Sequence, residues 1–347
     1  MKPFFCSAIT LIAFCTISMG ARGQNAPEST AASATNNPTA AAPAVSAPVG
    51  ASAPAPAVDV GCKNPKATGL SRFWELEPAS DCGTFGLRGY RPISLSVIGS
   101  DSVNLAPSSS TADHTATPLP YTTSETRMQL SVRTKVAQGL LTGGAPDRLD
   151  SLWFSYSQQS YWQLFNPTLS RPFRSTDHEP ELTYIYPLQS AQFGTWRLRY
   201  AGVSANHQSN GQSLPLSRSW NRIIAKAGWE YGNDFAINAN LWQRIPEDAA
   251  GDDNPEIADL VGRAEVAAVW NVDPLNALSM TVRHSLAANA NGSVRVAWWH
   301  KLGTAGAAGE RSGLRFHTEL FSGYGDSLLD YNRKRTVLSV GLTLLDW

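Results

Sequence analysis

The chain has 347 residues, a formal net charge of zero and a charged fraction of only 16%. An average soluble domain carries about 25% charged residues, so this surface differs from that of an ordinary soluble protein. The balanced charge lacks the basic excess of nucleic-acid-binding proteins, and no nucleic-acid partner is expected. The length allows one or two domains.

Residues 1–21 have the pattern of a signal peptide. Lys2 supplies a positive charge, an apolar core too short to span a bilayer follows, and small residues place the expected cleavage near Ala21. Residues 22–60 are almost entirely Ala, Pro, Ser, Thr and Asn. Such a composition cannot bury enough apolar surface to fold, so this segment is predicted to be a disordered linker.

Residues 61–88 form a small periplasmic segment before the first expected strand. This segment contains Cys62 and Cys82, the only cysteines that remain after cleavage. Export and an even cysteine count favour a disulfide between them. Two unpaired thiols in a flexible segment are the alternative.

From residue 89 to residue 347 the sequence alternates between apolar and polar residues in runs of about ten. No run of about 18 apolar residues occurs here, so helical membrane spans are not expected. The same alternation recurs in 293–302 and 313–321. The run at 126–136 shows it best, with the apolar residues at one parity and the polar residues at the other: Met128, Leu130 and Val132 against Arg127, Arg133 and Lys135.

This alternation fits either a soluble sandwich or an outer-membrane barrel, whose apolar row faces lipid. The polar rows are rich in Arg and Lys, and aromatic residues gather at strand ends, which favours the barrel. About twelve candidate strands lie between Arg91 and Trp347, joined by short turns such as 231–234 and longer loops such as 102–124. The prediction is an all-β fold, a twelve-stranded antiparallel transmembrane β-barrel in the outer membrane of a Gram-negative bacterium.

Three polar residues fall on the lipid-facing side of two adjacent strands. His207 and Ser209 follow the strand that starts at Trp196 and share the outward parity of Val203. Asn221, on the next strand, has the parity of its own outward row. A single His or Ser in a loop is more often a solvated residue. Three together on a wall where polar groups are costly indicate a function.

These residue types suit acyl transfer. Ser209 is the expected nucleophile and His207 the general base. Asn221 orients the imidazole in place of the usual acid. The amide of Gly211, with bound water, is expected to stabilise the oxyanion.

Several motifs spread over residues 90–347 are shared with one family. The turn reads HQSNG from His207 to Gly211, and the following strand begins SRSWN from Ser217 to Asn221. Further matches follow in the expected order: SYWQL at 160–164, PFR at 172–174, EP at 179–180, DDNP at 252–255 and SGYGDSLLD at 322–330. With these motifs the sequence resembles the outer membrane phospholipase A family.

The resemblance implies an enzyme that hydrolyses acyl esters of membrane phospholipids and lysophospholipids, with A1 and A2 activity. It also implies calcium as the cofactor, held by oxygen ligands that suit a hard cation. These are the Ser217 hydroxyl, the Asp253 carboxylate, the Gln212 carbonyl and the carbonyl of Ser170 of the partner subunit. Asp253 alone would be taken for an Asx-turn residue, so this assignment depends on the resemblance.

Dimerisation activates the enzyme in this family by completing the calcium site and the acyl-chain cleft, so an active homodimer is implied. The family interface contains a glutamine within the membrane. Gln158 lies in the outward row of Phe154 and Tyr156, as that role requires. A buried amide among lipid-facing side chains should find a partner across an interface. A position at the edge of the aromatic girdle is the alternative.

The chain departs from the family pattern at a few positions. Gln212 stands where an arginine is common, Leu214 replaces an acidic residue, and the last residue is Trp347 instead of the commoner Phe. Because the Gln212 ligand would be a backbone carbonyl, calcium binding is compatible with the first change. The alternative to an enzyme is a non-catalytic outer-membrane channel or structural barrel that retains the motif.

Overall fold

A computed structural model describes residues 64, 66–188, 192–249, 251–303 and 313–344. All of them belong to one compact unit, residues 57–347. The expected signal peptide, the linker, Cys62 and Trp347 lie outside the described residues.

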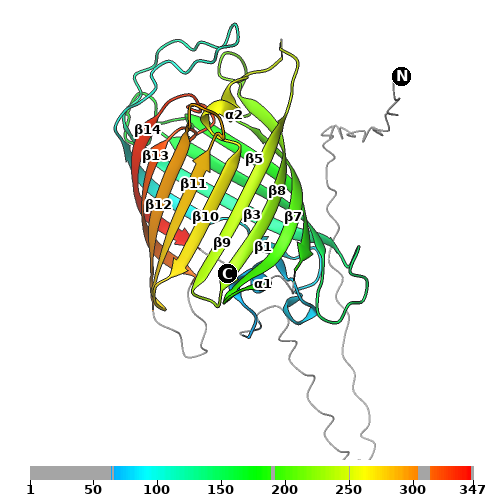
Figure 1. Ribbon diagram of the computed structural model, residues 1–347. Coiled ribbons are helices and arrows are strands. Elements are labelled where there is room, and N and C mark those ends of the chain that lie inside the picture. Colours follow the sequence, from blue (N-terminus) through cyan, green and yellow to red (C-terminus); the bar gives the residue numbers. More distant parts are fainter. Residues whose placement is uncertain (1–63, 65, 189–191, 250, 304–312, 345–347) are drawn as a thin grey trace, which may run out of the picture. The chain divides into compact units, whose positions relative to one another are not determined.

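Twelve long antiparallel strands form a closed barrel (Figure 1). The sheet contains fourteen strands, of which β1 (Leu87–Gly89) and β6 (Gln192–Phe193) are only short additions to β3 and β7. The other twelve are β2 (Ile93–Ser100), β3 (Ser124–Gln138), β4 (Ser151–Trp162), β5 (Ser175–Pro187), β7 (Trp196–Ser209), β8 (Ser219–Tyr231), β9 (Phe235–Ile245), β10 (Ala264–Asn271), β11 (Asn276–His284), β12 (Gly292–Lys301), β13 (Leu314–Gly323) and β14 (Arg335–Leu344). Each pairs with its neighbours along the chain, and β14 pairs with β2 to close the ring. The predicted fold is confirmed.

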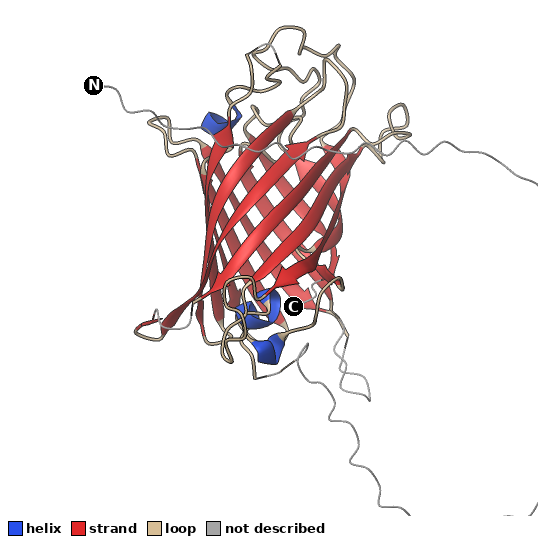
Figure 2. Cartoon of the chain, turned by 90° about the vertical axis from the view of Figure 1, so that its right-hand side faces the viewer, coloured by secondary structure: helices blue, strands red, loops and turns tan. Residues whose placement is uncertain are grey.

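Little helix accompanies the barrel. Helix α1 (Gly69–Trp74) and the 3-10 turn η2 (Pro78–Ser80) lie at one end, and α2 (Ile257–Leu260) lies at the other (Figure 2). In the described ranges, no helix has the length and apolar content needed to cross a membrane.

The two ends of the barrel differ in their connections. At the α2 end, called here the loop end, run the longer loops, such as 101–123 and 246–256. At the α1 end, called the plug end, several turns are short, such as 232–234 between β8 and β9. Outer-membrane barrels place their longer loops outside the cell and their short turns in the periplasm. By that rule the loop end is extracellular.

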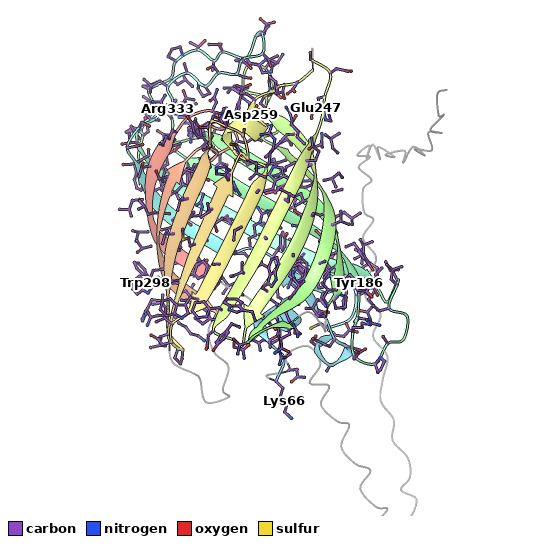
Figure 3. The ribbon with its side chains drawn as sticks, in the orientation of Figure 1. Lys66, Tyr186, Glu247, Asp259, Trp298 and Arg333 are labelled. Atoms are coloured by element: carbon purple, nitrogen blue, oxygen red, sulfur yellow. The ribbon has the colours of Figure 1, made fainter. Side chains whose placement is uncertain are left out.

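The barrel wall follows the predicted alternation. Val203 on β7 is 48% exposed and Ile223 on β8 is 44% exposed, because both point outward. Arg222 and Lys226, at the opposite parity of β8, are buried in the lumen. Trp298 and Tyr186 lie toward the plug end of the wall (Figure 3), as expected for one aromatic girdle.

The described part of segment 61–88 packs into the plug end of the barrel. Leu70, Trp74 and Leu76 form one apolar cluster with the inward-facing Trp153 and Tyr200. Buried aromatic rings of this kind stabilise a packed core by area and by edge-to-face contacts. The described part of this segment therefore forms a plug at that end of the barrel.

Ion pairs fasten the plug. Glu75 pairs with Arg88 and Lys135 at 2.6 Å each, and Lys135, which is fully buried, also pairs with Asp81 at 2.5 Å. Cys82, beside these groups, is disulfide-bonded. Its predicted pairing with Cys62 stays a prediction, because Cys62 is not among the described residues.

Candidate active site

The register of β7 against β8 brings the predicted catalytic residues together. His207 lies directly opposite Asn221, and Ser209 lies opposite Ser219. His207 Nδ1 is 2.9 Å from Asn221 Oδ1. Both residues are half-buried on the outer wall, because the intervening Asn206 and Arg222 point into the lumen and are buried.

The contact with Asn221 determines the tautomer of His207. An amide oxygen only accepts hydrogen bonds, so Nδ1 of His207 carries the hydrogen. The other ring nitrogen, Nε2, then has its lone pair free to accept a proton. No hydrogen bond joins Ser209 Oγ to His207 in the part of the chain that the structure describes. Catalytic hydrogen bonds are often long before substrate binds, so the absence of this bond does not contradict the prediction that Ser209 is the nucleophile and His207 its base.

Glu247 holds Asn221 from the other side. The Nδ2 of Asn221 donates to Glu247 Oε1 at 3.1 Å, so the amide oxygen is turned toward His207. Glu247 lies at the loop end (Figure 3), and burial raises the pKa of its carboxyl. The sequence analysis missed this residue. Glu247 lies two residues beyond Ile245, the partner of Asn221 across β8 and β9, and this register is visible only in the structure.

A second histidine flanks Ser209. His178 on β5 is the cross-strand partner of Ser209, and its Nδ1 lies 2.6 Å from the hydroxyl of Tyr156. Its ring also approaches Gly211, where an added Cβ would lie 3.6 Å from the ring atoms. Gly211 has φ +63°, a conformation that favours glycine. The sequence analysis missed His178, although it has the outward parity of Leu182 on the same strand.

One buried side chain organises the loop between β7 and β8. Asn210 accepts hydrogen bonds from the amides of Gln212 (3.3 Å) and Arg218 (3.0 Å) through Oδ1. Its Nδ2 donates to the carbonyl of Leu216 at 2.7 Å. A polar residue buried to this degree is stable only when its hydrogen bonds are satisfied. The loop that carries Gly211 and Gln212 is therefore held as one unit.

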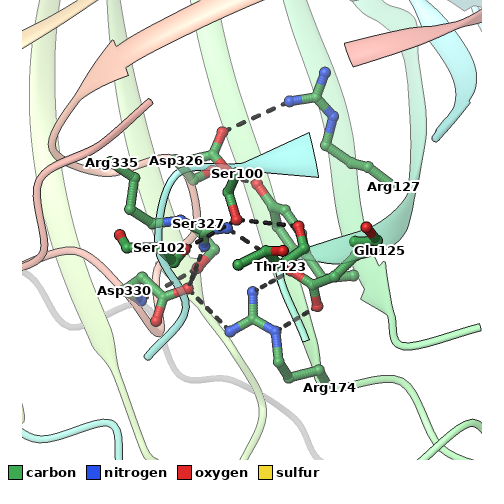
Figure 4. Close-up of polar contacts among 12 residues, drawn as sticks. Ser100, Ser102, Thr123, Glu125, Arg127, Arg174, Asp326, Ser327, Asp330 and Arg335 are labelled. Atoms are coloured by element: carbon green, nitrogen blue, oxygen red, sulfur yellow. Dashed lines mark hydrogen bonds and ion pairs between the residues drawn. The ribbon is translucent and has the colours of Figure 1, made fainter. Parts of the chain in front are cut away.

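Gln212 is tied to an ion-pair cluster in the barrel. Its Nε2 donates to the backbone carbonyl of Arg174 at 3.1 Å. The Arg174 guanidinium pairs with Glu125 at 2.6 Å and with Asp330 at 2.9 Å (Figure 4), and all three side chains are fully buried. Figure 4 also shows Arg127 reaching Asp326 nearby. Charges buried this deeply hold their geometry because each has an opposite partner.

Two of the four predicted calcium ligands meet. Ser217 Oγ donates to Asp253 Oδ2 at 2.6 Å, although 36 residues separate them in the sequence. Gln212 lies in the same loop as Ser217 and forms no hydrogen bond with Asp253 within the described ranges. Ser170 lies on the β4–β5 loop, where its carbonyl accepts a hydrogen bond from Trp162 Nε1 at 2.7 Å.

Gln158 faces outward at the middle of β4. It pairs in register with Leu130, which is 45% exposed. Its Oε1 accepts from the Tyr156 hydroxyl, and its Nε2 donates to Ser160 Oγ, each at 3.2 Å. An amide group has two N–H donors and two lone pairs, so half of its capacity stays available.

Comparison with known proteins identifies the family. The model of the family described as phospholipase A1 matches residues 70–344. A putative phospholipase A1 of Neisseria meningitidis serogroup B is 34% identical over 285 residues, which cover 80% of this chain and 70% of that protein. The phospholipase A1 of Escherichia coli K12 is 32% identical over 222 residues, which cover 64% of this chain and 70% of that protein.

Solved structures agree. Outer membrane phospholipase A from E. coli, in an active-site mutant with an asparagine changed to alanine, matches with a TM-score of 0.64 and 28% identity, covering 77% of this chain and 94% of that one. The Salmonella typhi outer membrane phospholipase dimer with bound calcium matches with a TM-score of 0.64 and 29% identity, covering 76% and 93%. The chain therefore belongs to the phospholipase A1 family of outer membrane phospholipases.

Proposed function

We propose that the chain is a calcium-dependent serine phospholipase, with Ser209 as nucleophile, His207 as general base and Asn221 as the residue that orients the base. The observation that carries this proposal is the 2.9 Å contact between His207 and Asn221 on the outer wall, on the strand that also bears Ser209. An active-site asparagine is also named for the E. coli relative. Because the site faces outward, its substrates are phospholipids of the surrounding membrane.

The chemistry proceeds by acyl transfer. Ser209 Oγ attacks the carbonyl carbon of an acyl ester, while its proton passes to His207 Nε2. Asn221 Oδ1 keeps the ring in position through Nδ1, and Glu247 keeps the amide from turning. The tetrahedral intermediate then breaks its bond to the glycerol oxygen, which takes the proton from His207. Water, deprotonated by the same histidine, next attacks the acyl-enzyme. The bond from the acyl carbon to Ser209 Oγ then breaks, Oγ takes the proton back from His207, and the fatty acid leaves.

The oxyanion needs positive charge close to Ser209. The Gly211 amide is one donor, on a loop that Asn210 holds rigid. Calcium, when bound, supplies Lewis-acid charge at this position. The donor set fits calcium, because Ser217 and Asp253 present oxygen atoms and the Asp253 carboxylate is 16% exposed. The Gln212 carbonyl would be the third ligand from this chain.

Dimerisation would complete the site. The carbonyl of Ser170 of the partner subunit is proposed as the last protein ligand, and Gln158 as a contact across the interface. The Salmonella typhi relative is a dimer with bound calcium, which supports both assignments. The free hydrogen-bonding capacity of Gln158 at the middle of the wall supports its role in particular.

The side chains and the plug that fill the barrel lumen argue against the alternative function of a channel. Inside the lumen, Arg222 of β8 pairs with Glu179 of β5 at 3.0 Å, and Lys226 of β8 pairs with Glu181 of β5 at 2.8 Å. The plug formed by α1 and η2 occupies the plug end. Side chains and a plug together leave an interior cavity of about 470 Å³. Such an interior suits a support for the outer wall better than an open pore.

The decisive test compares purified wild-type protein with Ser209→Ala on phospholipid vesicles or micelles, with calcium and with a chelator. We expect Ser209→Ala to abolish fatty-acid release while the barrel remains folded, as seen by heat-modified gel mobility. Chelation should abolish release in the wild type, and added calcium should restore it. Hydrolysis that persists in Ser209→Ala protein would refute the assignment.

A further inference from the structure

One side chain outside the proposed calcium ligands contacts the Asp253 carboxylate. His114, from the β2–β3 loop, places Nε2 at 2.9 Å from Asp253 Oδ1. The hydroxyl of Ser217 lies at 2.6 Å from the other oxygen, Oδ2. The carboxylate is therefore held on one oxygen by His114 and on the other by the second proposed calcium ligand.

Both ring nitrogens of His114 donate hydrogen bonds. Nδ1 lies 2.6 Å from the carbonyl oxygen of Ala112, which only accepts hydrogen bonds, so Nδ1 carries a hydrogen. The Asp253 carboxylate also only accepts, so Nε2 carries a hydrogen as well. The ring is therefore an imidazolium without a lone pair for a metal ion. Any role of His114 toward calcium acts through Asp253.

A small hairpin in the β2–β3 loop presents His114 in a fixed position. Ser108 and Thr115 form a β-bridge, and the Ser109 amide donates to the His114 carbonyl at 3.0 Å. Asp113 turns the chain with φ +61°, a value that Asp and Asn tolerate better than most residues. His114 is only 6% exposed, so its ring has little room to turn.

The hairpin is also fastened to the loop that carries Asp253. Thr111 Oγ1 donates to the Asp252 carbonyl at 2.6 Å, and Ser110 Oγ donates to Glu256 at 2.7 Å. Asp252 and Glu256 lie on either side of Asp253 in the sequence. Several contacts therefore define the distance between His114 and Asp253.

The contact with His114 leaves Asp253 able to bind calcium. Each carboxylate oxygen has two lone pairs, so Oδ1 can keep its hydrogen bond from His114 while Oδ2 binds an ion. The Ser217 hydroxyl can turn its hydrogen away and offer its oxygen to the same ion. The Asp253 side chain is 16% exposed, so an ion can reach it.

We propose that His114 is a positioning residue for calcium, whose Nε2–H holds Oδ1 of Asp253 so that Oδ2 faces Ser217 before the ion binds. Carboxylates that bind metals are commonly held by hydrogen bonds from residues that do not touch the metal. Loss of such a bond lowers metal affinity by roughly 10- to 100-fold. This inference rests on the proposed function, because it requires Asp253 to be a calcium ligand.

Two properties of His114 act on calcium binding in opposite directions. The positive charge of the ring repels a calcium ion at the same carboxylate. The hydrogen bond favours binding, because a carboxylate that is already fixed loses less conformational freedom when the ion binds. Substitutions can separate the two properties. Gln keeps an N–H donor without the charge, whereas Phe lacks both.

The test is isothermal calorimetry with calcium on the full-length, detergent-solubilised protein, at one pH and one protein concentration for every variant. We expect His114→Phe to bind calcium at least about tenfold more weakly than the wild type. His114→Gln should bind calcium at least as tightly as the wild type. His284→Phe is the matched control and should bind as the wild type does, because His284 is exposed and its ring contacts only the Leu286 amide among the described residues.

Heat-modified gel mobility checks that each variant is folded, and His114→Leu replaces His114→Phe if the phenyl ring prevents folding. Calcium affinity in His114→Phe equal to or tighter than that of the wild type would overturn the positioning role. Equal losses in His114→Phe and His114→Gln would overturn it too, because the amide restores the donor. In these cases the wild type still binds calcium and the proposed function stands. A wild type without a calcium isotherm would instead refute calcium dependence itself, and the role of His114 with it.

Discussion

The plug end and the loop end of the barrel both contain carboxylates with close polar partners, but these carboxylates differ in their exposure to solvent. At the plug end, Glu75 and Lys135 are almost completely excluded from solvent and paired with each other. At the loop end, Asp253 has partners on both oxygens but stays partly exposed. Buried pairs fix a structure because an unpaired charge there is costly. A carboxylate that stays partly exposed, as that of Asp253 does, can exchange a partner for an ion. The solvent exposure of the carboxylate therefore distinguishes the structural ion pair at Glu75 from the proposed ion-binding group at Asp253.

The same contrast applies to the barrel wall. The inward face of β8 places Arg222 and Lys226 in ion pairs with carboxylates of β5. The outward face of the same strand carries Asn221, whose contacts run to His207 and Glu247. The lumen network therefore holds β5 and β8 in place from the inside, and the proposed catalytic residues lie on a part of the wall that is supported from within.

The largest effect is expected at the outer wall of the loop end. His207→Ala should lower kcat/KM by a factor on the order of 10⁴, because the nucleophile loses its base. His178→Phe is the matched control, since His178 also flanks Ser209 but contacts Tyr156 instead of Asn221. We expect that variant to keep at least about a tenth of the activity. If fatty-acid release fell further in His178→Phe than in His207→Ala, His178 and not His207 would be the general base.

At the plug end the expected effect is on stability. Lys135→Met leaves Glu75 and Asp81 without their shared cation and should reduce the free energy of unfolding by about 3–5 kcal/mol. Hydrolysis per folded molecule should stay close to that of the wild type, because the proposed catalytic residues lie toward the other end. Lys334→Met, at an exposed position of the loop end, is the control and should change little. Urea titration of both variants in lipid vesicles measures the difference.

An effect of intermediate size is expected for Gln158, in the middle of the barrel wall. Gln158→Ala removes the side-chain amide and should weaken the detergent-solubilised dimer by about 1 kcal/mol, or roughly fivefold in the dissociation constant. Cross-linking in the presence of calcium measures the dimer fraction. The same fraction in wild type and variant would show that Gln158 is only a residue of the girdle.

The smallest effect is expected for Glu247→Gln. Burial raises the pKa of this carboxyl, so the protonated group stabilises the fold at low pH. That stability is lost as the pH rises through the folded-state pKa. The Gln variant lacks this loss, so its urea midpoint should fall less than that of the wild type between about pH 4 and about pH 8. A steeper fall in the variant would contradict the direction of the shift.

Local patterns explain which parts were predictable from sequence. Alternation with a period of two places side chains on one of two faces, so the barrel and the outward position of His207 and Asn221 follow from short stretches. The joint position of His114 and Asp253 does not, because it depends on how two loops that are far apart in the sequence pack against each other. The plug was not predicted, since residues 66–86 contain no alternation and its place is defined by residues of distant strands, among them Trp153, Tyr200 and Lys135.

The direct pairing of His207 with Asn221 has a consequence for barrel assembly. A shift of β7 by one residue against β8 would turn the side chains of the shifted strand toward the opposite face, and the two residues would part. A shift of one residue in the pairing of these strands would therefore be detected as a loss of hydrolysis, although most folding assays do not detect such a shift. Inserting one residue into β7 should silence the enzyme, whereas an insertion in the β10–β11 turn should leave it active. Loss of hydrolysis would therefore identify barrels in which β7 and β8 are paired out of register.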